Sequence, residues 1–269
     1  MHTNRALVGL TVGATGALLA LGALPAAAAD TATVSVLHAV PDTPVDVYAN
    51  GEELLPDFQP GTLTDPLELP AGSYDLQVFP AGADPQADDP AIEGSVDVPA
   101  GANATLVAHL AEDGTPTLTP FVNDTSEVEA GSARVTVRHT AAAPAVDVRA
   151  GGEPVIEGLT NPNEESLTVP AGTVSADVVV AGTDTVAIGP ADLDLAEGSN
   201  TVVYAWGSEE AGYELATQSI DASSAPSGVP GGTAGLVDDA GMPAGLVALS
   251  LAGLVGAGIA GRRLVATRG

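Results

Sequence analysis

The sequence predicts an all-β protein made of two tandem antiparallel β-sandwich domains of the immunoglobulin/transthyretin type, followed by one C-terminal transmembrane helix. Three observations support this prediction. The stretch HAVPDTPVDVYANGE at 38–52 returns as HTAAAPAVDVRAGGE at 139–153. Short β-branched runs separated by Pro, Gly, Asn and Asp fill both copies. An uncharged apolar segment stands at 243–261.

The first 29 residues predict a secretory signal peptide. Arg5 precedes a long apolar run, and this run ends in Pro25 and the small residues at 26–29. A basic start, an apolar middle and a small-residue end are typical of a cleavable export signal. We expect cleavage before Asp30, so the residues that follow are predicted to be exported.

The repeat extends beyond the opening stretch. LPAG at 69–72 matches VPAG at 169–172, and GAN at 101–103 matches GSN at 198–200. The order of these segments is the same in both copies and their spacing changes little, which is typical of a tandem duplication. The resulting domain prediction is a first sandwich at 30–124, a linker at 125–132 and a second sandwich at 133–221.

Each copy has the pattern of short strands. In SYDLQVF at 73–79, Tyr74, Leu76 and Val78 alternate with polar residues, which predicts one apolar face. The LPAG and VPAG tetrads carry Pro and Gly where type I turns favour them. Six or seven such strands in each copy, without a helical period, predict two sheets packed face to face. Trp206 is expected to anchor the core of the second copy.

The C-terminal part predicts a membrane anchor. Ser, Pro, Gly, Ala and Asp dominate 222–242, which predicts a flexible stalk. The segment 243–261 reaches about 30 Å as a helix, the thickness of a bilayer core. Arginines at 262 and 263 follow, so 262–269 is predicted to be a basic cytoplasmic tail. We therefore expect a single-pass membrane protein whose N-terminal domains lie at the cell surface.

Attachment to the cell wall is an alternative to this anchor. A sortase substrate combines an apolar span and a basic tail with an LPxTG motif. The sequence before the span is VPGGTAG at 229–235, which lacks that order. Plain anchoring in the membrane is the preferred interpretation.

Charge and composition exclude several function classes. The formal net charge is −28 at pH 7, there is no Lys, and all 35 acidic residues lie between the two apolar ends. Such a charge repels phosphates, so no nucleic-acid binding is expected. The absence of Cys excludes disulfides, thiol nucleophiles and cysteine metal sites. No cofactor is predicted.

His38 and Asp46, with their repeat equivalents His139 and Asp147, are the first candidates for chemistry. They could act as base and acid of a hydrolytic site, but no GxSxG motif supplies a nucleophile and the site would have to exist twice. Alternatively, the His binds a loop carbonyl and the Asp accepts backbone N–H groups. The structural interpretation is preferred, and no catalytic residue is predicted.

The loop after the first His is where the two copies differ. Pro41, Asp42 and Thr43 have no matching sequence in the second copy. If the protein has a site, the sequence places it at this loop together with His38 and Asp46.

Two groups of carboxylates are weak candidates for Ca²⁺, which prefers oxygen ligands. Neither group has the spacing of a DxDxDG loop, and an acidic chain produces such groups by chance. The histidines lack the spacing of a zinc site. No metal site is therefore predicted, and the weak candidates are Asp84, Asp88, Asp89, Asp192, Asp194 and Glu197.

Recognition of sugars or peptides is the remaining binding hypothesis. Aromatic residues make up only 3% of the chain, so few are left for a sugar-binding platform once the cores are filled. Binding of a peptide as an added strand would require only an open sheet edge.

The segment VSVLHAVPDTPVDVYANGE at 34–52 resembles the opening of the DUF4397 family, an extracellular bacterial domain. The first copy follows the family pattern from His38 through VDVY at 45–48 to LPAG at 69–72. The second copy departs from it, because Ala142 and Ala143 replace Pro-Asp and an Arg replaces the Tyr. The resemblance covers about 30–220 and implies a β-sandwich at the cell surface, with no established activity and no catalytic residues. The richness in Ala and Gly and the lack of Lys suggest an actinobacterial source.

Two functions follow from these observations. The preferred one is a non-enzymatic surface protein for adhesion, ligand binding or spacing, with a cell-envelope or extracellular protein as partner and the membrane bound through the C-terminal helix. The alternative is an enzyme, or an accessory factor of one, that acts on envelope polymers through the His38/Asp46 region. An enzyme requires a cleft with a perturbed titratable group. A spacer or adhesin requires only that His38 be buried and hydrogen-bonded.

Overall fold

The computed structural model describes residues 31–222, which form sixteen β-strands and no α-helix. Within these residues, no helix is available that could cross a membrane. The all-β prediction is confirmed for this part of the chain. The predicted signal peptide, the stalk beyond residue 222, the transmembrane helix and the basic tail lie outside the described residues.

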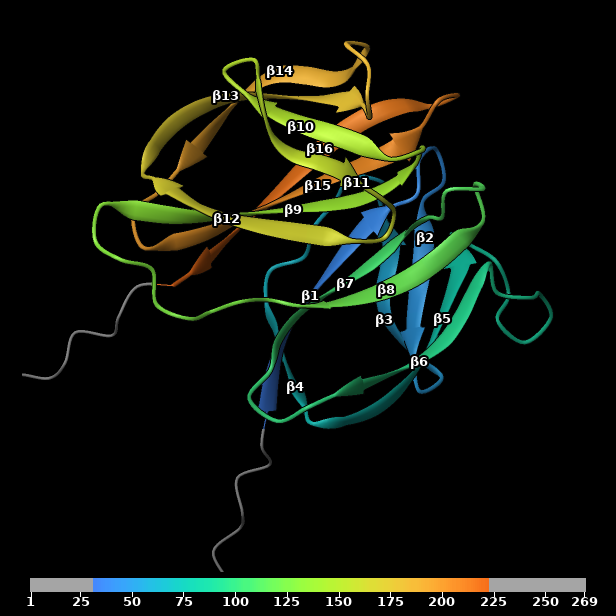
Figure 1. The fold of residues 1–269 in the computed structure, drawn as a ribbon. Helices are drawn as coiled ribbons and strands as arrows, with labels where there is room; N and C mark the ends of the chain where they lie inside the picture. Colours follow the sequence, from blue (N-terminus) through green and yellow to red (C-terminus); the bar gives the residue numbers. More distant parts are fainter. Residues whose placement is uncertain (1–30, 223–269) are drawn as a thin grey trace, which may run out of the picture. The chain divides into compact units, whose positions relative to one another are not determined.

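The first eight strands form two four-stranded sheets (Figure 1). We call β4-β1-β7-β8 the inner sheet of the first sandwich and β3-β2-β5-β6 its outer sheet. The strands are β1 (Thr31–Ala39), β2 (Val45–Ala49), β3 (Glu52–Phe58), β4 (Leu67–Pro70), β5 (Gly72–Pro80), β6 (Ile92–Val98), β7 (Asn103–Leu110) and β8 (Pro116–Val122).

The next eight strands repeat this topology strand for strand. The inner sheet of the second sandwich is β12-β9-β15-β16 and its outer sheet is β11-β10-β13-β14. The strands are β9 (Ser132–Ala142), β10 (Val146–Ala150), β11 (Glu153–Leu159), β12 (Glu164–Pro170), β13 (Gly172–Val180), β14 (Val186–Leu195), β15 (Ser199–Ser208) and β16 (Gly212–Asp221).

The central pair of each inner sheet is parallel, whereas the sequence predicts antiparallel sheets. β1 pairs in parallel with β7, and β9 pairs in parallel with β15. The chain visits the outer sheet twice between these strands, and parallel neighbours require such crossover connections. The other strand pairs of the four sheets are antiparallel.

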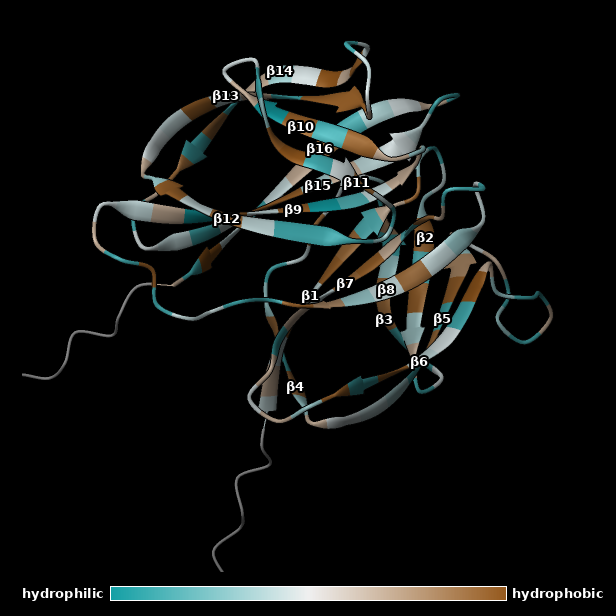
Figure 2. Ribbon diagram, in the orientation of Figure 1, coloured by the Kyte–Doolittle hydropathy of each residue, from teal (hydrophilic) through white to brown (hydrophobic). Residues whose placement is uncertain are grey.

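Each sandwich has a core between its two sheets. Val36 of β1 and Ala108 of β7 meet Val47, Phe58 and Val78 of the outer sheet in the first sandwich. The second sandwich repeats this arrangement with the cluster Val137, Val146, Val148, Ile156, Leu159 and Val178. Apolar and polar residues alternate along β10 (Figure 2), so one face of this strand enters the core.

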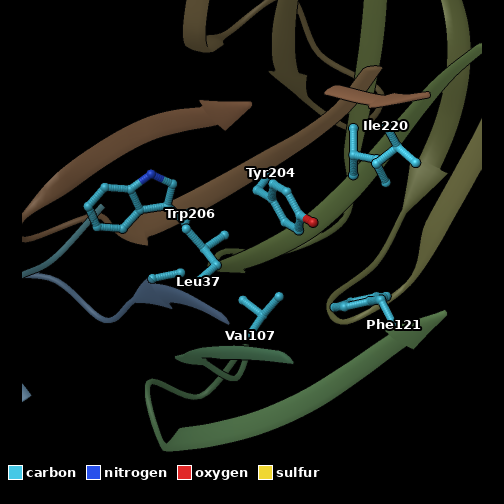
Figure 3. Packing of buried hydrophobic residues seen from close by; sticks show 8 residues of the cluster. Leu37, Val107, Phe121, Tyr204, Trp206 and Ile220 are labelled. Atoms are coloured by element: carbon cyan, nitrogen blue, oxygen red, sulfur yellow. The ribbon is translucent and has the colours of Figure 1, made fainter. Parts of the chain in front are cut away.

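A third cluster lies between the two inner sheets (Figure 3). The first sandwich contributes Leu37, Ala39, Val107 and Phe121, and the second contributes Val202, Tyr204, Trp206 and Ile220. Trp206 is buried, as expected, but it lies in this shared cluster and not inside the second sandwich. The inner strands are therefore covered on both faces, which explains why β1 and β15 are almost completely buried.

Candidate functional site

His38 lies at the end of β1 and holds the loop that follows. Its side chain is buried, and Nε2 lies 2.8 Å from the carbonyl oxygen of Thr43. A carbonyl only accepts hydrogen bonds, so Nε2 donates the proton. His139 repeats this contact, with Nε2 3.0 Å from the carbonyl oxygen of Pro144. The imidazole therefore closes the same strand-loop-strand joint in both sandwiches.

Burial lowers the pKa of both histidines, because desolvation disfavours the imidazolium form. The hydrogen bonds to the carbonyls of Thr43 and Pro144 act in the opposite direction but have the smaller effect. The histidines of both joints are therefore uncharged at neutral pH.

Asp46 and Asp147 tie two loops to their sandwiches. One carboxylate oxygen of Asp46 accepts the N–H of Asp57 at 2.7 Å and the other accepts the N–H of Gly82 at 2.9 Å. Asp147 binds Gly158 and Gly182 at the same two distances. The N–H groups of Gly182 and Gly158 lower the pKa of the Asp147 carboxyl group. Each carboxylate thus joins the irregular pairing of β2 with β3, or of β10 with β11, to the loop that follows β5 or β13, the other neighbour of its strand in the sheet.

The structure does not combine His38 and Asp46 into a catalytic pair. Within residues 31–222 no hydrogen bond or ion pair joins their side chains, because each is bound to backbone groups of its own joint. The cavity beside His38 has a volume of about 20 Å³ and is otherwise lined by apolar side chains such as Val47 and Phe58. That volume holds about one water molecule, not a substrate.

The loop residues lie at the surface beside this joint. Pro41 is half-buried, and the side chains of Asp42 and Thr43 are exposed. Asp42 adopts a left-handed backbone conformation with φ of 63°. In the part of the chain that the structure describes, neither the Asp42 nor the Thr43 side chain makes a hydrogen bond, and the Thr43 carbonyl is bound to His38.

The carboxylates considered for Ca²⁺ do not converge. Asp84 and Asp88 accept backbone N–H groups within their own turn, and Asp89 is exposed beside them. Asp192 and Asp194 are exposed on β14, whereas Glu197 accepts the N–H of Gly131 at 2.8 Å. Across residues 31–222, no three His, Cys, Asp or Glu side chains are grouped so that they could hold a metal ion.

Sequence reasoning missed the role of Arg138 where the two sandwiches meet. Arg138 on β9 is only 1% exposed, and its Nε donates to a carboxylate oxygen of Glu164 at 2.7 Å. One terminal guanidinium nitrogen donates to the Tyr204 hydroxyl at 2.7 Å, and the guanidinium lies over the ring of Phe121. The only sequence signal was a charged residue inside the β-branched run VTVRHT at 135–140.

Gln218 on β16 completes this contact. Its side-chain oxygen accepts the hydroxyls of Thr105 at 2.9 Å and Tyr204 at 2.7 Å. Its amide nitrogen donates to the Ser35 hydroxyl at 3.3 Å. The two sandwiches, which belong to one compact unit, are thus joined by apolar contacts and by the hydrogen bonds of Gln218 with Thr105 and Ser35.

A cleft of about 640 Å³ opens at one end of this contact. Its lining includes His109 at the end of β7, Thr117 and Thr119 on β8, and Pro162 from the loop before β12. Nδ1 of His109 donates to the Leu110 carbonyl at 2.9 Å, so Nε2 accepts the Thr119 hydroxyl at 2.8 Å. Burial lowers the pKa of His109, while its bond to Leu110 acts in the opposite direction.

Asn161 fixes the far wall of this cleft. Its amide nitrogen donates to the Leu110 carbonyl of the first sandwich at 2.8 Å and to the Ala141 carbonyl of the second at 2.6 Å. The cleft is therefore a fixed feature of the contact, and it was not among the candidate sites predicted from the sequence.

The joint of His38 and Asp46 and the first sandwich lie within a match to a known family model. Residues 32–149 match DUF4397, a domain of unknown function. The DUF4397 match spans β1 to β10, so it includes the whole first sandwich and the first two strands of the second. It supports the resemblance drawn from the segment at 34–52.

Two solved structures show distant similarity to this chain. The TIE protein of Bacillus anthracis is 11% identical with a TM-score of 0.22, and the comparison covers 66% of this chain and 34% of that protein. A cell adhesion protein, so described provisionally, from Bacteroides uniformis is 10% identical with a TM-score of 0.19, over 72% of this chain and all of that one. The chain thus spans about a third of the TIE protein. No curated protein matches the sequence.

Proposed function

We propose that this chain is an extracytoplasmic, membrane-anchored binding protein that catalyses no reaction. It consists of two DUF4397-like sandwiches at 30–124 and 133–221, of immunoglobulin/transthyretin type, joined by a linker at 125–132. A signal peptide precedes them, and a stalk and a C-terminal helix hold them at the cell surface. The partner is a component of the cell envelope or an extracellular protein.

One observation carries the non-enzymatic part of this proposal. His38 and Asp46 direct their polar atoms at backbone groups of their own sandwich, and His139 and Asp147 do the same. A general base needs a nitrogen or oxygen that can reach a substrate proton. Residues that persist in both copies with the same backbone partners have the character of structural joints.

The contact between the sandwiches supports a role in binding. Gln218 of the second sandwich holds the two inner sheets together through hydrogen bonds with Thr105 and Ser35 of the first. Surface residues of both sandwiches therefore keep a fixed arrangement. A preorganised surface binds with a smaller entropy loss than a flexible one.

The charge of the chain restricts the partner. With a net charge of −28, the protein repels polyanions and attracts groups that carry positive charge. Neutral or basic components of the envelope are therefore preferred over anionic polymers.

The proposal is tested by incubating the purified full chain with isolated cell envelopes. Retention in the envelope pellet and release of soluble sugar and peptide fragments are measured together, at low and at high salt. We expect retention without release. Release that disappears in the His38→Gln variant would instead identify the alternative, an enzyme acting on envelope polymers through the His38/Asp46 region.

A further inference from the structure

The second sandwich has an apolar cavity between its two sheets. The cavity has a volume of about 80 Å³, and residues of β9 and β12 form one wall while residues of the outer sheet form the other. Apart from Arg149, every residue that lines it is apolar. A space with such walls favours hydrocarbon over water, because a water molecule finds no hydrogen-bond partners there.

The same end of the first sandwich is filled by larger side chains. Ala176 lies where the first copy has Leu76, and Val174 lies where it has Tyr74, as the repeated LPAG and VPAG segments show. Leu76 belongs to the core of the first sandwich, and Tyr74 packs against this core. An isobutyl group and a phenol ring are thus replaced by a methyl and an isopropyl group, which leaves space in the second sandwich.

Solvent reaches the walls of this cavity. Val135 and Leu193 are half-buried, whereas the equivalent residues of the first sandwich, Val34 and Val96, are buried. Leu193 adds only one methylene group relative to Val96, so it does not restore the missing volume. Val155 also lines the cavity, and it is 42% exposed. The cavity is therefore accessible from outside.

Its size restricts the occupant to a small group. Pockets for whole small-molecule ligands usually have volumes of about 300–1,000 Å³. An apolar cavity of about 150 Å³ is large enough for benzene. A cavity of about 80 Å³ is therefore suited to one branched aliphatic side chain, and it is too small for a complete ligand or a lipid chain.

The strands beside the cavity are acidic. β11 and β12 are edge strands of the two sheets and contact each other. Glu153 and Glu157 on β11 and Glu165 on β12 are exposed. These carboxylates repel anionic molecules such as fatty acids, whereas they attract a molecule that carries positive charge.

We propose that this cavity binds one leucine-sized aliphatic side chain of a neutral or basic extracellular polypeptide. The bound side chain takes the place that the isobutyl group of Leu76 has in the first sandwich. This inference rests on the proposed binding function and names the group that is recognised on the partner. Burial of the side chain favours association because apolar surface is removed from water.

The test is an NMR titration of the purified full chain with three blocked tripeptides, Lys-Leu-Lys, Lys-Ala-Lys and Glu-Leu-Glu. We expect Lys-Leu-Lys to bind at one site. Lys-Ala-Lys should bind about tenfold more weakly or worse, because its side chain lacks three carbon atoms. Glu-Leu-Glu should also bind more weakly, and this second difference should shrink at high salt.

Two variants fill the cavity with the side chains of the first sandwich. Ala176→Leu and Val174→Tyr should each weaken binding of Lys-Leu-Lys by about tenfold or more. Val174→Tyr remains informative if Ala176→Leu does not fold. Ala87→Leu is the matched control, because it adds the same side chain at an exposed position of the first sandwich and should leave binding unchanged.

The cavity is also tested without a ligand. Ala176→Leu should raise the urea concentration at the midpoint of unfolding, because the added side chain fills empty apolar space. A lower midpoint for this variant would show that a leucine side chain does not fit, and it would overturn the proposal.

Four binding results would also overturn it: no binding of Lys-Leu-Lys at millimolar concentration, equal binding of Lys-Ala-Lys, unchanged binding in a folded cavity-filling variant, or tighter binding of 1-octanol, which would make an alkyl chain the occupant. Retention on envelopes without peptide binding would overturn the cavity proposal alone. Peptide binding without retention on envelopes would overturn the proposed function alone.

Discussion

The guanidinium of Arg138 lies 4.5 Å from the ring centre of Phe121, and these two residues come from different sandwiches. The residue equivalent to Arg138 in the first copy is Leu37, as the matching sequences around His38 and His139 show. Phe121 pairs with Thr105 and Gln218 pairs with Val202, so Phe121 and Gln218 are also equivalent. The two copies therefore differ at the positions where they face each other. The Arg that is present only in the second copy packs on the Phe that is present only in the first.

The Arg138–Phe121 contact should contribute measurably to stability. We expect Arg138→Leu and Phe121→Leu each to lower the free energy of unfolding, with a coupling of about 1–2 kcal/mol in a double-mutant cycle, because the cation lies over the ring in a desolvated place. Urea unfolding of the four proteins measures it. Arg149→Leu is a matched control on the outer sheet, and its effect should be additive with that of Phe121→Leu. Additivity of Arg138→Leu with Phe121→Leu would contradict the prediction.

The carboxylate of Asp46 should stabilise the protein through its two backbone hydrogen bonds. Asp46→Asn keeps one acceptor oxygen but turns an NH₂ group toward a backbone N–H, so one of the two hydrogen bonds with Asp57 and Gly82 is lost. We expect the free energy of unfolding to fall by about 1–3 kcal/mol. Asp42→Asn, on an exposed side chain of the same region, should have little effect. Equal effects of the two substitutions would show that the joint does not depend on Asp46.

The three buried histidines should make stability fall in mild acid. Burial lowers the pKa of His38, His109 and His139 in the folded protein, so the unfolded chain takes up protons first as the pH falls below about 6.5. Their contribution is fully present above that pH and is lost as the pH falls toward the lowered pKa values. The expected slope between pH 7 and 5.5 is at most about 1.4 kcal/mol per pH unit for each histidine.

The variant His139→Gln isolates this effect from the titration of surface carboxylates. It should be less stable than the wild type at pH 7, and the difference should shrink at pH 5.5. Urea unfolding at several pH values measures both quantities. A difference that stays constant over this range would mean that His139 keeps the same protonation in the folded and unfolded states.

Trp206 should tolerate loss of its polar atom but not of its volume. Its buried Nε1 has no hydrogen-bond partner among the described residues. Trp206→Phe should therefore change the free energy of unfolding much less than Trp206→Ala, for which we expect a loss of about 3–5 kcal/mol. Circular dichroism is the suitable probe, since Trp206 is the only tryptophan and fluorescence would be lost with it. Similar losses for both variants would indicate that Nε1 makes a hydrogen bond in solution.

The parts of the fold that were predictable are those with local patterns. Alternation in SYDLQVF and the repeated VDV segments predicted β5, β2 and β10 because one face of each strand enters a core. The sequence EELLPDF of β3 was not recognised as a strand. It lies at a sheet edge, where acidic residues and a proline are tolerated because one side of the strand needs no partner.

The contact between the sandwiches could not be predicted, since its signals are not local. Leu37 and Val107 look like ordinary core residues. Strand alternation places them on the opposite face from Val36 and Ala108, but nothing in the sequence shows that the second sandwich covers that face. The cleft at His109 depends on Pro162, which is 53 positions away in the chain and belongs to the other sandwich. The backbone contacts of His38 with Thr43 and of Asp46 with Asp57 were easier to infer, because these partners lie close in the chain.

The shared cluster between the inner sheets has the form of a homodimer interface enclosed in one chain. The same faces meet from both sides, as they do in an isologous pair of identical subunits. In such a pair every substitution would appear twice. Once the two copies are part of a single polypeptide, one position can carry Trp206 while its counterpart carries His109, so the two ends of the contact can be filled by side chains of different size and chemistry.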